Sequence, residues 1–379
     1  MQFRDLKQQY LSLKSEIDQA ITNVAASSAY IMGPQVKEIE HKLAEYVDTK
    51  HCISCANGTD ALSIALKVWK IGAGDAVFVP DFTFFASAEV VSLEGATPIF
   101  VDVDLDTFNI SPTSLDIAIN KTIKEGKLKP KVVIAVDLFG LPANYPEIRQ
   151  ICDKYNLLLL EDGAQGFGGS INNKRSCSFG DISTTSFFPA KPLGCYGDGG
   201  AIFTDNDNWA TLADSYRVHG KGSFKYDNER IGMNSRLDTI QAAILLVKLK
   251  AFKDYELKAV NIIADKYTKS LSERNLSEII KTPLIPTNFY SSWAQYTIRF
   301  KTKEKRDRMQ TILKSNDIPS MIYYPIPMHC QSAYKNLNYS NNSFPASLEL
   351  CNTVLSLPMH PYLTDEEINH ICNIIKINL

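Results

Sequence analysis

The chain has 379 residues, of which 45% are hydrophobic, enough to bury a core and to form two domains. Its net charge is −2 with both signs interspersed, which gives no support to a protein that binds nucleic acid or an anionic membrane. Residues 1–7 are charged and do not resemble a signal peptide, and the longest apolar runs are too short to span a bilayer. We therefore expect a cytoplasmic protein.

The hydrophobic pattern of the first fifty residues predicts two helices. Apolar residues recur every three to four positions over residues 5–26, and a second helical pattern over residues 36–47 follows the helix-breaking pair Gly33 and Pro34. Strands and helical patterns then alternate. Strands are predicted at residues 51–56, 76–79, 97–101, 132–136, 157–161 and 182–188. Because these runs are apolar on both faces, they predict a mainly parallel sheet covered by helices on both sides.

The pattern changes after about residue 250, where lysine-rich helical patterns alternate with short strands such as residues 296–300. An extended segment with prolines covers residues 321–329, and a last helix over residues 364–375 opens with a capping box. We therefore predict an α/β protein with an N-terminal segment and a large domain in residues 1–250, and a smaller C-terminal α/β domain in residues 251–379.

The eight cysteines are scattered, so reduced thiols are expected rather than disulfides. Cys52 and Cys55 form a Cys-x-x-Cys pair, but neither a second pair nor a histidine cluster accompanies them, as a zinc site would require. We interpret both as small apolar side chains of a strand. The six histidines show no metal-ligand spacing, and no metal site is expected.

Two residues point to chemistry with pyridoxal phosphate (PLP). Lys191 lies between Pro189 and Pro192 in an apolar stretch, and poor hydration lowers the pKa of a lysine and yields a neutral, nucleophilic amine. Asp162 ends a buried strand, where a carboxylate can keep a pyridine nitrogen protonated. Taken alone, Lys191 could be an ordinary surface lysine, and Asp162 could be an aspartate that caps the next helix. Together they are what PLP chemistry requires.

Other polar residues follow predicted strands. Gly58 and Thr59 open a helix whose N-terminus favours a phosphate, and Ser186 offers a hydroxyl to the same group. Gln165 is placed to hydrogen-bond the phenolic oxygen of the cofactor. Phe84 is a candidate to stack on the pyridine ring, although aromatic residues in such a place belong more often to the core.

A further polar segment precedes a predicted helix that begins near Leu237. Ser235 and Asp238 are predicted to cap this helix, which leaves Asn234 and Arg236 at its start, where they could reach an anion.

These motifs resemble the DegT/DnrJ/EryC1/StrS family of sugar aminotransferases, which are PLP enzymes with the aspartate-aminotransferase fold (fold type I). The matching segments follow one another along nearly the whole chain at residues 5–7, 30–34, 57–62, 161–165, 186–191 together with 197–200, and 234–238. The resemblance implies that Lys191 binds PLP covalently and moves the proton, and that Asp162 pairs with the pyridine nitrogen. A branch of the family with histidine at this lysine position is a dehydratase, so Lys191 favours transamination.

The resemblance also implies the remaining cofactor contacts. These are Gln165 at the ring oxygen, Phe84 on the ring face, Gly58, Thr59 and Ser186 at the phosphate, and Asn234 at the phosphate of the neighbouring subunit. A homodimer with shared active sites is therefore expected.

Residues 52–60, 191–200 and 357–362 look most like family members that act on UDP-2-acetamido-2-deoxy-3-oxo-glucuronate in bacterial surface-polysaccharide (O-antigen, lipopolysaccharide) biosynthesis. This implies L-glutamate as amino donor, pyridoxamine phosphate (PMP) between the half-reactions, and Arg236 at the uronate carboxylate. Tyr323, Tyr324 and His329 are expected near the sugar.

Three alternatives stay open at this point. The branch tends to carry histidine at the position of Tyr323, so a transaminase of dTDP-3-oxo-6-deoxyhexoses is one alternative. A non-catalytic PLP-binding sensor of the same fold is another. A nicotinamide dehydrogenase is disfavoured, because residues 57–59 lack the Gly-x-Gly-x-x-Gly spacing.

Overall fold

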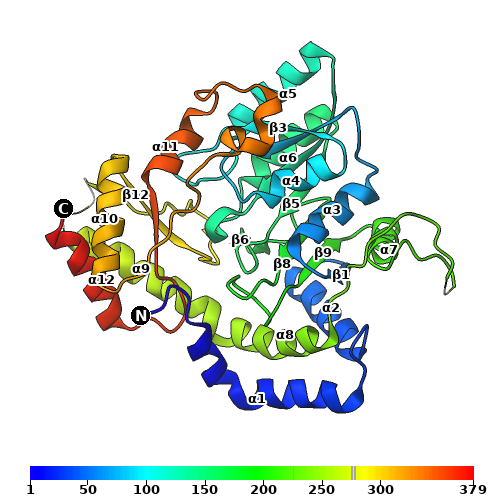
Figure 1. Cartoon of the computed structure of the whole chain (residues 1–379), viewed down its shortest axis with the longest axis horizontal. Helices are drawn as coiled ribbons and strands as arrows, with labels where there is room; N and C mark the ends of the chain where they lie inside the picture. The colour runs from blue at the N-terminus through cyan, green and yellow to red at the C-terminus, as the bar shows by residue number, and fades with distance from the viewer. Residues whose placement is uncertain (225, 275, 277–278) are drawn as a thin grey trace.

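A seven-stranded sheet forms the centre of the protein, seen in a computed structural model that describes residues 1–224, 226–274, 276 and 279–379 (Figure 1). The strand order is β1-β9-β8-β5-β4-β2-β3. The strands are β1 (His51–Cys55), β2 (Asp75–Pro80), β3 (Thr97–Val101), β4 (Lys129–Val136), β5 (Leu158–Asp162), β8 (Ile182–Ser186) and β9 (Gly200–Thr204). Neighbours from β3 to β8 pair in parallel, whereas β9 runs antiparallel to β8 and β1. The predicted mainly parallel sheet is confirmed.

Alternating side chains of the strands bury two cores, one on each face of the sheet. In β2, Val77 and Val79 pack with the helices of one face, and Ala76 and Phe78 pack with those of the other. The first face carries α3 (Gly58–Val68), α4 (Ala86–Leu93) and α7 (Asp207–Tyr216). The second carries α2 (Pro34–Val47), α5 (Pro112–Glu125), α6 (Tyr145–Tyr155) and α8 (Thr239–Ala251). Both faces are therefore covered, as the double-sided apolar pattern requires.

The C-terminal part has its own sheet and core. Strands β10 (Ile280–Lys281), β12 (Tyr296–Phe300) and β13 (Val354–Leu357) form a three-stranded antiparallel sheet. Its core includes residues of α9 (Leu257–Glu273), α10 (Lys303–Ser315) and α12 (Asp365–Ile377). The predicted capping box at the start of α12 is present, formed by Thr364 and Glu367. The division of the chain at residue 250 stays a prediction.

Short elements connect these parts. They are η1 (Leu138–Gly140), β6 (Ser170–Ile171), β7 (Lys174–Arg175), β11 (Phe289–Tyr290), η2 (Phe252–Glu256, a π-helical turn), η3 (Met328–Cys330), η4 (Ser332–Leu337) and α11 (Pro345–Thr353). Met328, Tyr334 and Leu350 join the core on the first face of the large sheet, so the C-terminal part of the chain packs directly against it.

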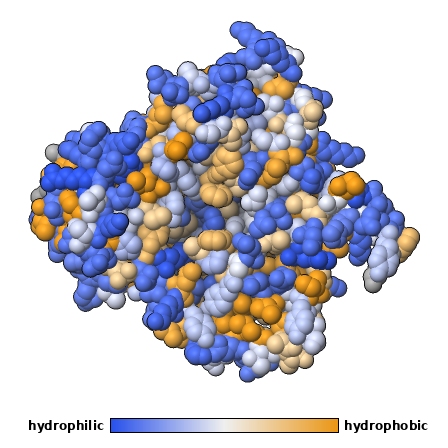
Figure 2. Space-filling view, in the orientation of Figure 1, coloured by the Kyte–Doolittle hydropathy of each residue, from blue (hydrophilic) through white to orange (hydrophobic). Residues whose placement is uncertain are grey.

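Helix α1 (Leu6–Ser27) lies along α8 at the lower edge of the molecule (Figure 1). Leu13 and Ile17 pack against Ile244 and Ala251 of α8. On the face drawn in Figure 2, hydrophilic and hydrophobic surfaces are mixed, with a large hydrophobic area low in the view. Within the described residues, no helix combines the length and the apolar character that a membrane crossing requires. All eight cysteines are free.

Candidate functional site

The carboxylates that end β5 have opposite roles, because successive side chains of a strand point to opposite faces. Glu161 accepts hydrogen bonds from the backbone N–H of Phe179 (2.7 Å) and from the hydroxyl of Ser183 (2.7 Å), and it is fully buried. Asp162 accepts the hydroxyl of Ser87 (2.7 Å) and the N–H of Ala164 (3.2 Å). Glu161 is committed to the fold, and Asp162 is the carboxylate of the candidate site.

Asp162 and Lys191 influence each other electrostatically. Burial raises the pKa of Asp162, while the Ser87 hydrogen bond and the charge of Lys191 act in the opposite direction. Burial lowers the pKa of Lys191, against the attraction of Asp162. Lys191 is therefore partly withdrawn from water, as the flanking prolines led us to expect, and the net effect of its surroundings is a lowered pKa despite the attraction of Asp162.

Gln165 joins the large sheet to the C-terminal part of the chain. Its side-chain oxygen accepts the N–H of Phe139 (2.7 Å), and its NH₂ group donates to the hydroxyl of Tyr324 (3.0 Å). The Tyr324 ring lies 6.2 Å from the rings of Phe82 and Phe84, measured between centroids. Phe84 is 53% exposed, so its face is accessible to a ring. The structure thus brings Gln165, Phe84 and Tyr324 together.

The start of α3 meets the end of β8 at very short range. Asn57 caps α3 by accepting the N–H of Asp60 (2.7 Å). A Cβ atom at Gly58 would lie 2.7 Å from Cβ and 3.2 Å from Oγ of Ser186, so only glycine allows this approach. The Ser186 hydroxyl therefore lies beside the first turn of α3, which contains Thr59 and has free N–H groups by its position.

Asn234 and Arg236 lie apart from this group, at the base of a loop that projects from the molecule (described residues 218–224 and 226–236, green at the right of Figure 1). Arg236 donates to the side-chain oxygen of Asn234 and lines an open hollow of about 970 Å³ under this loop. The predicted capping role of Ser235 is wrong, because its hydroxyl accepts the N–H of Ala56 (3.1 Å). Asp238 is the N-cap residue of α8, without a side-chain capping bond.

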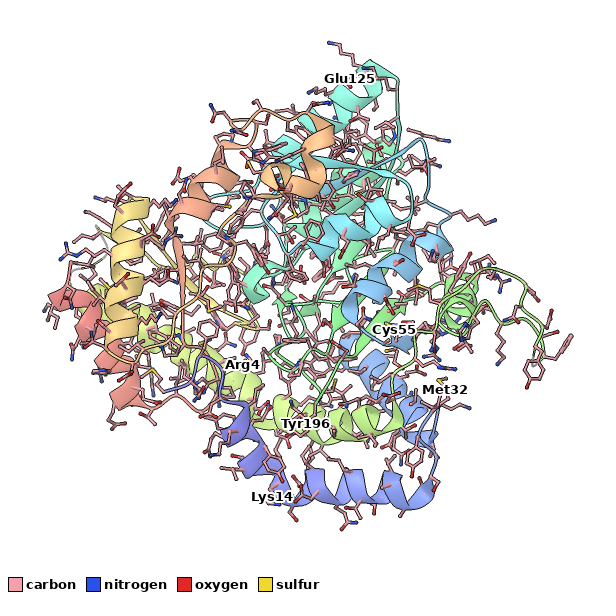
Figure 3. All side chains as sticks on the ribbon, viewed as in Figure 1. Arg4, Lys14, Met32, Cys55, Glu125 and Tyr196 are labelled. Atoms are coloured by element: carbon pink, nitrogen blue, oxygen red, sulfur yellow. The ribbon has the colours of Figure 1, made fainter. Side chains whose placement is uncertain are left out.

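Two residues that sequence reasoning missed touch the site. Ser87 orients the carboxylate of Asp162, although 75 positions separate them. Arg4 donates to the backbone oxygen of Lys191 (3.0 Å) from the N-terminal segment, 187 positions away, and Figure 3 shows its position above α8. No local pattern marks either residue, because each acquires its role from a contact between distant segments.

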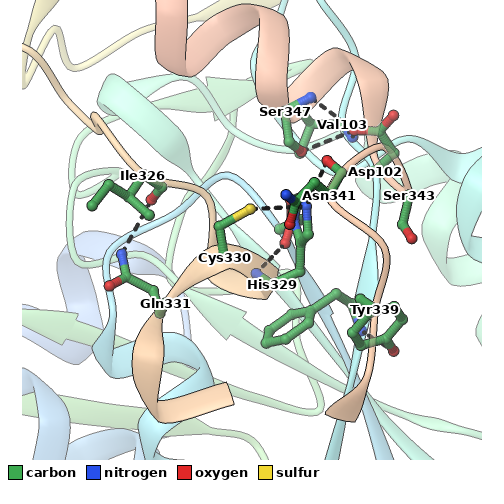
Figure 4. A network of polar contacts seen from close by, with 12 residues as sticks. Asp102, Val103, Ile326, His329, Cys330, Gln331, Tyr339, Asn341, Ser343 and Ser347 are labelled. Carbon is green, nitrogen blue, oxygen red and sulfur yellow. Dashed lines mark hydrogen bonds and ion pairs between the residues drawn. The ribbon is translucent and has the colours of Figure 1, made fainter. Parts of the chain in front are cut away.

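The prediction that His329 contacts the sugar is corrected by the structure. Its side chain has no exposed surface, and Nδ1 lies 2.7 Å from a carboxylate oxygen of the equally buried Asp81. Burial by itself would lower the pKa of His329, but Asp81 outweighs this effect and the net pKa is raised. On its other side the ring contacts the backbone oxygen of Asn341 (3.2 Å) and the thiol of Cys330 (3.2 Å; Figure 4). His329 therefore ties the C-terminal segment to the residue that follows β2.

Tyr323 lies next to Tyr324 and is half-buried, with a ring centroid 6.1 Å from that of Phe3. Tyr323 therefore contacts both Tyr324 and the N-terminal segment.

The residues fit PLP better than a metal ion. In the described part of the chain, no group of three or more histidine, cysteine or acidic side chains could hold a metal. The buried Asp162 carboxylate suits a protonated ring nitrogen, since a nearby cation offsets its desolvation. The close approach of Gly58 and Ser186 leaves a hydroxyl and a helix N-terminus for a phosphate.

Comparisons with known proteins agree with this reading. The model of the DegT/DnrJ/EryC1/StrS aminotransferase family matches residues 11–376. The UDP-2-acetamido-2-deoxy-3-oxo-D-glucuronate aminotransferase of Pseudomonas aeruginosa is 43% identical over 372 residues, which are 98% of each protein.

Solved structures superimpose closely. A DegT DnrJ EryC1 StrS aminotransferase from Brucella abortus has a TM-score of 0.94 and 48% identity, covering 99% of this chain and 98% of the other. S. venezuelae DesV in complex with a ketimine intermediate has a TM-score of 0.92 and 32% identity, covering 99% and 97%. NtdA from Bacillus subtilis with bound cofactor PMP has a TM-score of 0.86 and 28% identity, covering 96% and 82%.

Proposed function

Because this chain belongs to the DegT/DnrJ/EryC1/StrS aminotransferase family, we propose that it transfers an amino group from L-glutamate to the 3-keto group of UDP-2-acetamido-2-deoxy-3-oxo-D-glucuronate. Family membership makes it a PLP-dependent nucleotide-sugar aminotransferase. The observation that best supports the substrate is the 43% identity, over 98% of both proteins, to an aminotransferase with this specificity. Bacterial surface-polysaccharide (lipopolysaccharide, O-antigen) biosynthesis is the proposed context.

In the proposed mechanism, Lys191 is the acid and base of the reaction. Bound PLP would supply an aldehyde that captures the substrate amine and a pyridinium ring that withdraws electrons from the reacting carbon. Burial favours a neutral Lys191 amine, which can accept the proton of the donor's α-carbon at Nζ. In the second half-reaction the same nitrogen returns a proton, now to the sugar carbon that receives the amino group.

Other residues hold and orient the cofactor in this proposal. Asp162 faces the ring nitrogen, and Ser87 keeps its carboxylate in one orientation. The NH₂ group of Gln165 donates one hydrogen to Tyr324, and its second hydrogen would bond the ring oxygen. Phe84 covers the ring with its exposed face.

The phosphate would be held at the opposite end of the cofactor. Gly58 and Thr59 offer backbone N–H groups at the start of α3, and Ser186 offers its hydroxyl beside them.

We further propose that the active unit is a homodimer in which Asn234 serves the phosphate of the neighbouring subunit. Asn234 is exposed. Among the described residues, it contacts Val218 and Arg236, and none of its described contacts joins it to Ser186 of the same chain. The adjoining surface carries exposed apolar side chains, such as Ile31, which is 51% exposed. The backbone of this segment lies close in space to Asn234, because Ile31 forms a bridge to Asp238 and the backbone oxygen of Tyr30 accepts the N–H of Thr239 (2.9 Å). Exposed apolar side chains around a polar functional residue are typical of a protein–protein interface.

Substrate contacts are proposed for Tyr323 and Tyr324 in the site of their own chain, and for Arg236, which would serve the site of the neighbouring subunit as its partner Asn234 does. The guanidinium of Arg236 suits the uronate carboxylate because it binds both oxygens at once. Burial raises the pKa of Tyr323 and Tyr324, so both phenols stay protonated and can donate a hydrogen bond to the sugar.

A substrate panel tests the proposal. Purified protein with PLP and L-glutamate is incubated with UDP- and dTDP-linked 3-keto sugars that carry either a carboxylate or a methyl group at C6, and the amino sugars are measured by mass spectrometry. We expect conversion of the UDP-linked uronate. Conversion of the dTDP-linked 6-deoxy sugars alone would establish the alternative substrate, and glutamate that leaves PLP unconverted would indicate a non-catalytic sensor.

Arg236→Gln separates recognition of the carboxylate from chemistry. We expect it to raise KM for the uronate at least about tenfold, as loss of a charge-assisted pair predicts, with little change for a methyl-bearing analogue. Arg230→Gln, in the same hollow, is the matched control.

A further inference from the structure

The segment before α1 crosses from the C-terminal part of the chain to the lysine of the proposed site. The backbone oxygen of Phe3 accepts the N–H of Met359 (3.0 Å), and its ring lies beside that of Tyr323. Two residues later, Asp5 caps α1 by accepting the N–H of Gln8 (2.8 Å). The residue between them, Arg4, is thus held in place on both sides.

Arg4 directs its side chain at the loop that carries Lys191. Its Nη2 donates to the backbone oxygen of Lys191 (3.0 Å) and, with a longer bond, to that of Pro192 (3.4 Å). The loop is also fixed from its other side, where the N–H of Lys191 donates to the oxygen of Phe188 (2.8 Å). One charged group therefore holds two consecutive carbonyl groups at the point where the Lys191 side chain leaves the backbone.

The anchor of this contact is buried and polar. Gln9, in the first turns of α1, donates to a carboxylate oxygen of Glu256 (2.8 Å), and the hydroxyl of Tyr362 donates to the same oxygen (2.7 Å). Glu256 and Gln9 are both buried. Because α1 is held against η2 in this way, Arg4 is positioned by the fold and does not depend on a free N-terminal end.

We propose that Arg4 is a positioning residue for Lys191, which clamps the two carbonyl groups of the lysine loop and places a fixed positive charge near its amine. This inference rests on the proposed function, in which Lys191 is the cofactor-binding lysine.

The electrostatic part of the role follows from the charges that face Lys191. Burial is the largest cause of its lowered pKa, Asp162 on β5 acts in the opposite direction, and Arg4 on the N-terminal segment adds to the lowering. Burial also lowers the pKa of Arg4 itself, but a guanidinium remains charged in proteins. Arg4 thus favours the unprotonated amine that the proposed chemistry needs.

The test uses the protein without cofactor, so that it reads the lysine directly. A trace acylating reagent labels Lys191 over a range of pH, mass spectrometry measures the labelled fraction, and hydrogen exchange follows the peptide around residues 189–197. Arg4→Met removes the charge and the clamp, whereas Arg4→Lys keeps the charge but can hold only one carbonyl group well. Lys7→Met, at an exposed residue in the first turn of α1, is the matched control.

In Arg4→Met we expect the midpoint of labelling to move to higher pH and labelling near neutral pH to fall at least about twofold, because more of the amine is protonated. Exchange in the lysine loop should rise several-fold in both Arg4 variants, since both weaken the clamp. Arg4→Lys should keep a labelling midpoint near that of the native protein, which a purely structural role of Arg4 would not predict.

Labelling and exchange in Arg4→Met that match Lys7→Met would overturn the inference. If Arg4→Met does not fold, native-like exchange in folded Arg4→Lys has the same meaning. The proposed function is tested separately: native protein that gives no reducible PLP adduct at Lys191 would overturn it. The two failures can be told apart because labelling and exchange are measured without cofactor.

Discussion

The buried end of β5 and the projecting loop (described residues 218–224 and 226–236) are built in opposite ways. Asp162 is 5% exposed, and its partners come from a distant helix and from the loop that carries Lys191. In the projecting loop, Ile231 is 92% exposed, and the loop forms local backbone contacts, such as the bridge between Lys221 and Asn228.

The two regions differ in how far contacts within the chain fix their side chains. Polar groups at the strand ends have defined partners within the chain, so their orientation and pKa are determined by this fold. The loop exposes apolar side chains that a monomer gains nothing by presenting to water. We therefore expect a change of charge at the end of β5 to alter activity, and a substitution in the projecting loop to alter the association of subunits.

The largest effect is expected for Lys191→Ala. If Lys191 has the proposed role, loss of its amine removes covalent cofactor binding and proton transfer together, and turnover should fall at least about a thousandfold. Mass spectrometry after borohydride reduction should find no adduct at position 191. Lys121→Ala, on the surface of α5, should retain both. An adduct elsewhere with full activity would contradict the assignment.

Asp162→Asn comes next, because it changes the charge and nearly preserves the shape. If this carboxylate pairs with the ring nitrogen as proposed, its loss should lower kcat about 100-fold, the size of a main electrostatic contribution. The folded fraction, followed by circular dichroism, should stay high. The exposed Asp198→Asn is the control for removal of a negative charge nearby. Turnover within a fewfold of native would argue against the pyridinium role.

Ile231→Asp tests the projecting loop. If the loop contacts a second subunit, a buried charge should weaken dimerisation at least about tenfold, which corresponds to about 1.4 kcal/mol. Sedimentation over a range of concentrations measures the change. Ile117→Asp, equally apolar and 63% exposed on α5, is the comparison. Equal dimer affinity in both variants would remove the loop from the interface.

The last prediction concerns the pH dependence of stability, which involves no change in activity. Burial and the charge of Arg4 lower the pKa of His360 from 6.5 to about 4, so between these values the unfolded chain binds a proton that the native protein does not. Stability therefore falls as the pH falls through this window, by at most about 3 kcal/mol for this residue.

His360→Asn should flatten that part of the stability profile, measured by urea unfolding between pH 7 and pH 4. The same substitution at His219, in the projecting loop, shows how removal of a histidine acts outside the buried region. A slope in His360→Asn as steep as in the native protein would contradict the assignment.

Local patterns in the sequence predicted many elements closely. The predicted strands at residues 97–101 and 296–300 agree with β3 and β12, and the capping box of α12 is formed as predicted. Side-chain periodicity and capping depend on residues a few positions apart, so a single segment contains the information. Strand β9 escaped prediction because it follows a glycine-rich run whose local signal is that of a turn.

The tertiary structure alone decided which polar groups meet. Ser87 hydrogen-bonds Asp162, Arg4 hydrogen-bonds the lysine loop, and Asp81 contacts His329. The Ser235 hydroxyl, predicted to cap a helix, instead accepts the N–H of Ala56, which follows β1. The sequence by itself determined the α/β alternation and the residue types that suit PLP. The pairings depend on the packing of segments far apart in the chain, where burial makes an unsatisfied polar group costly and so selects its partner.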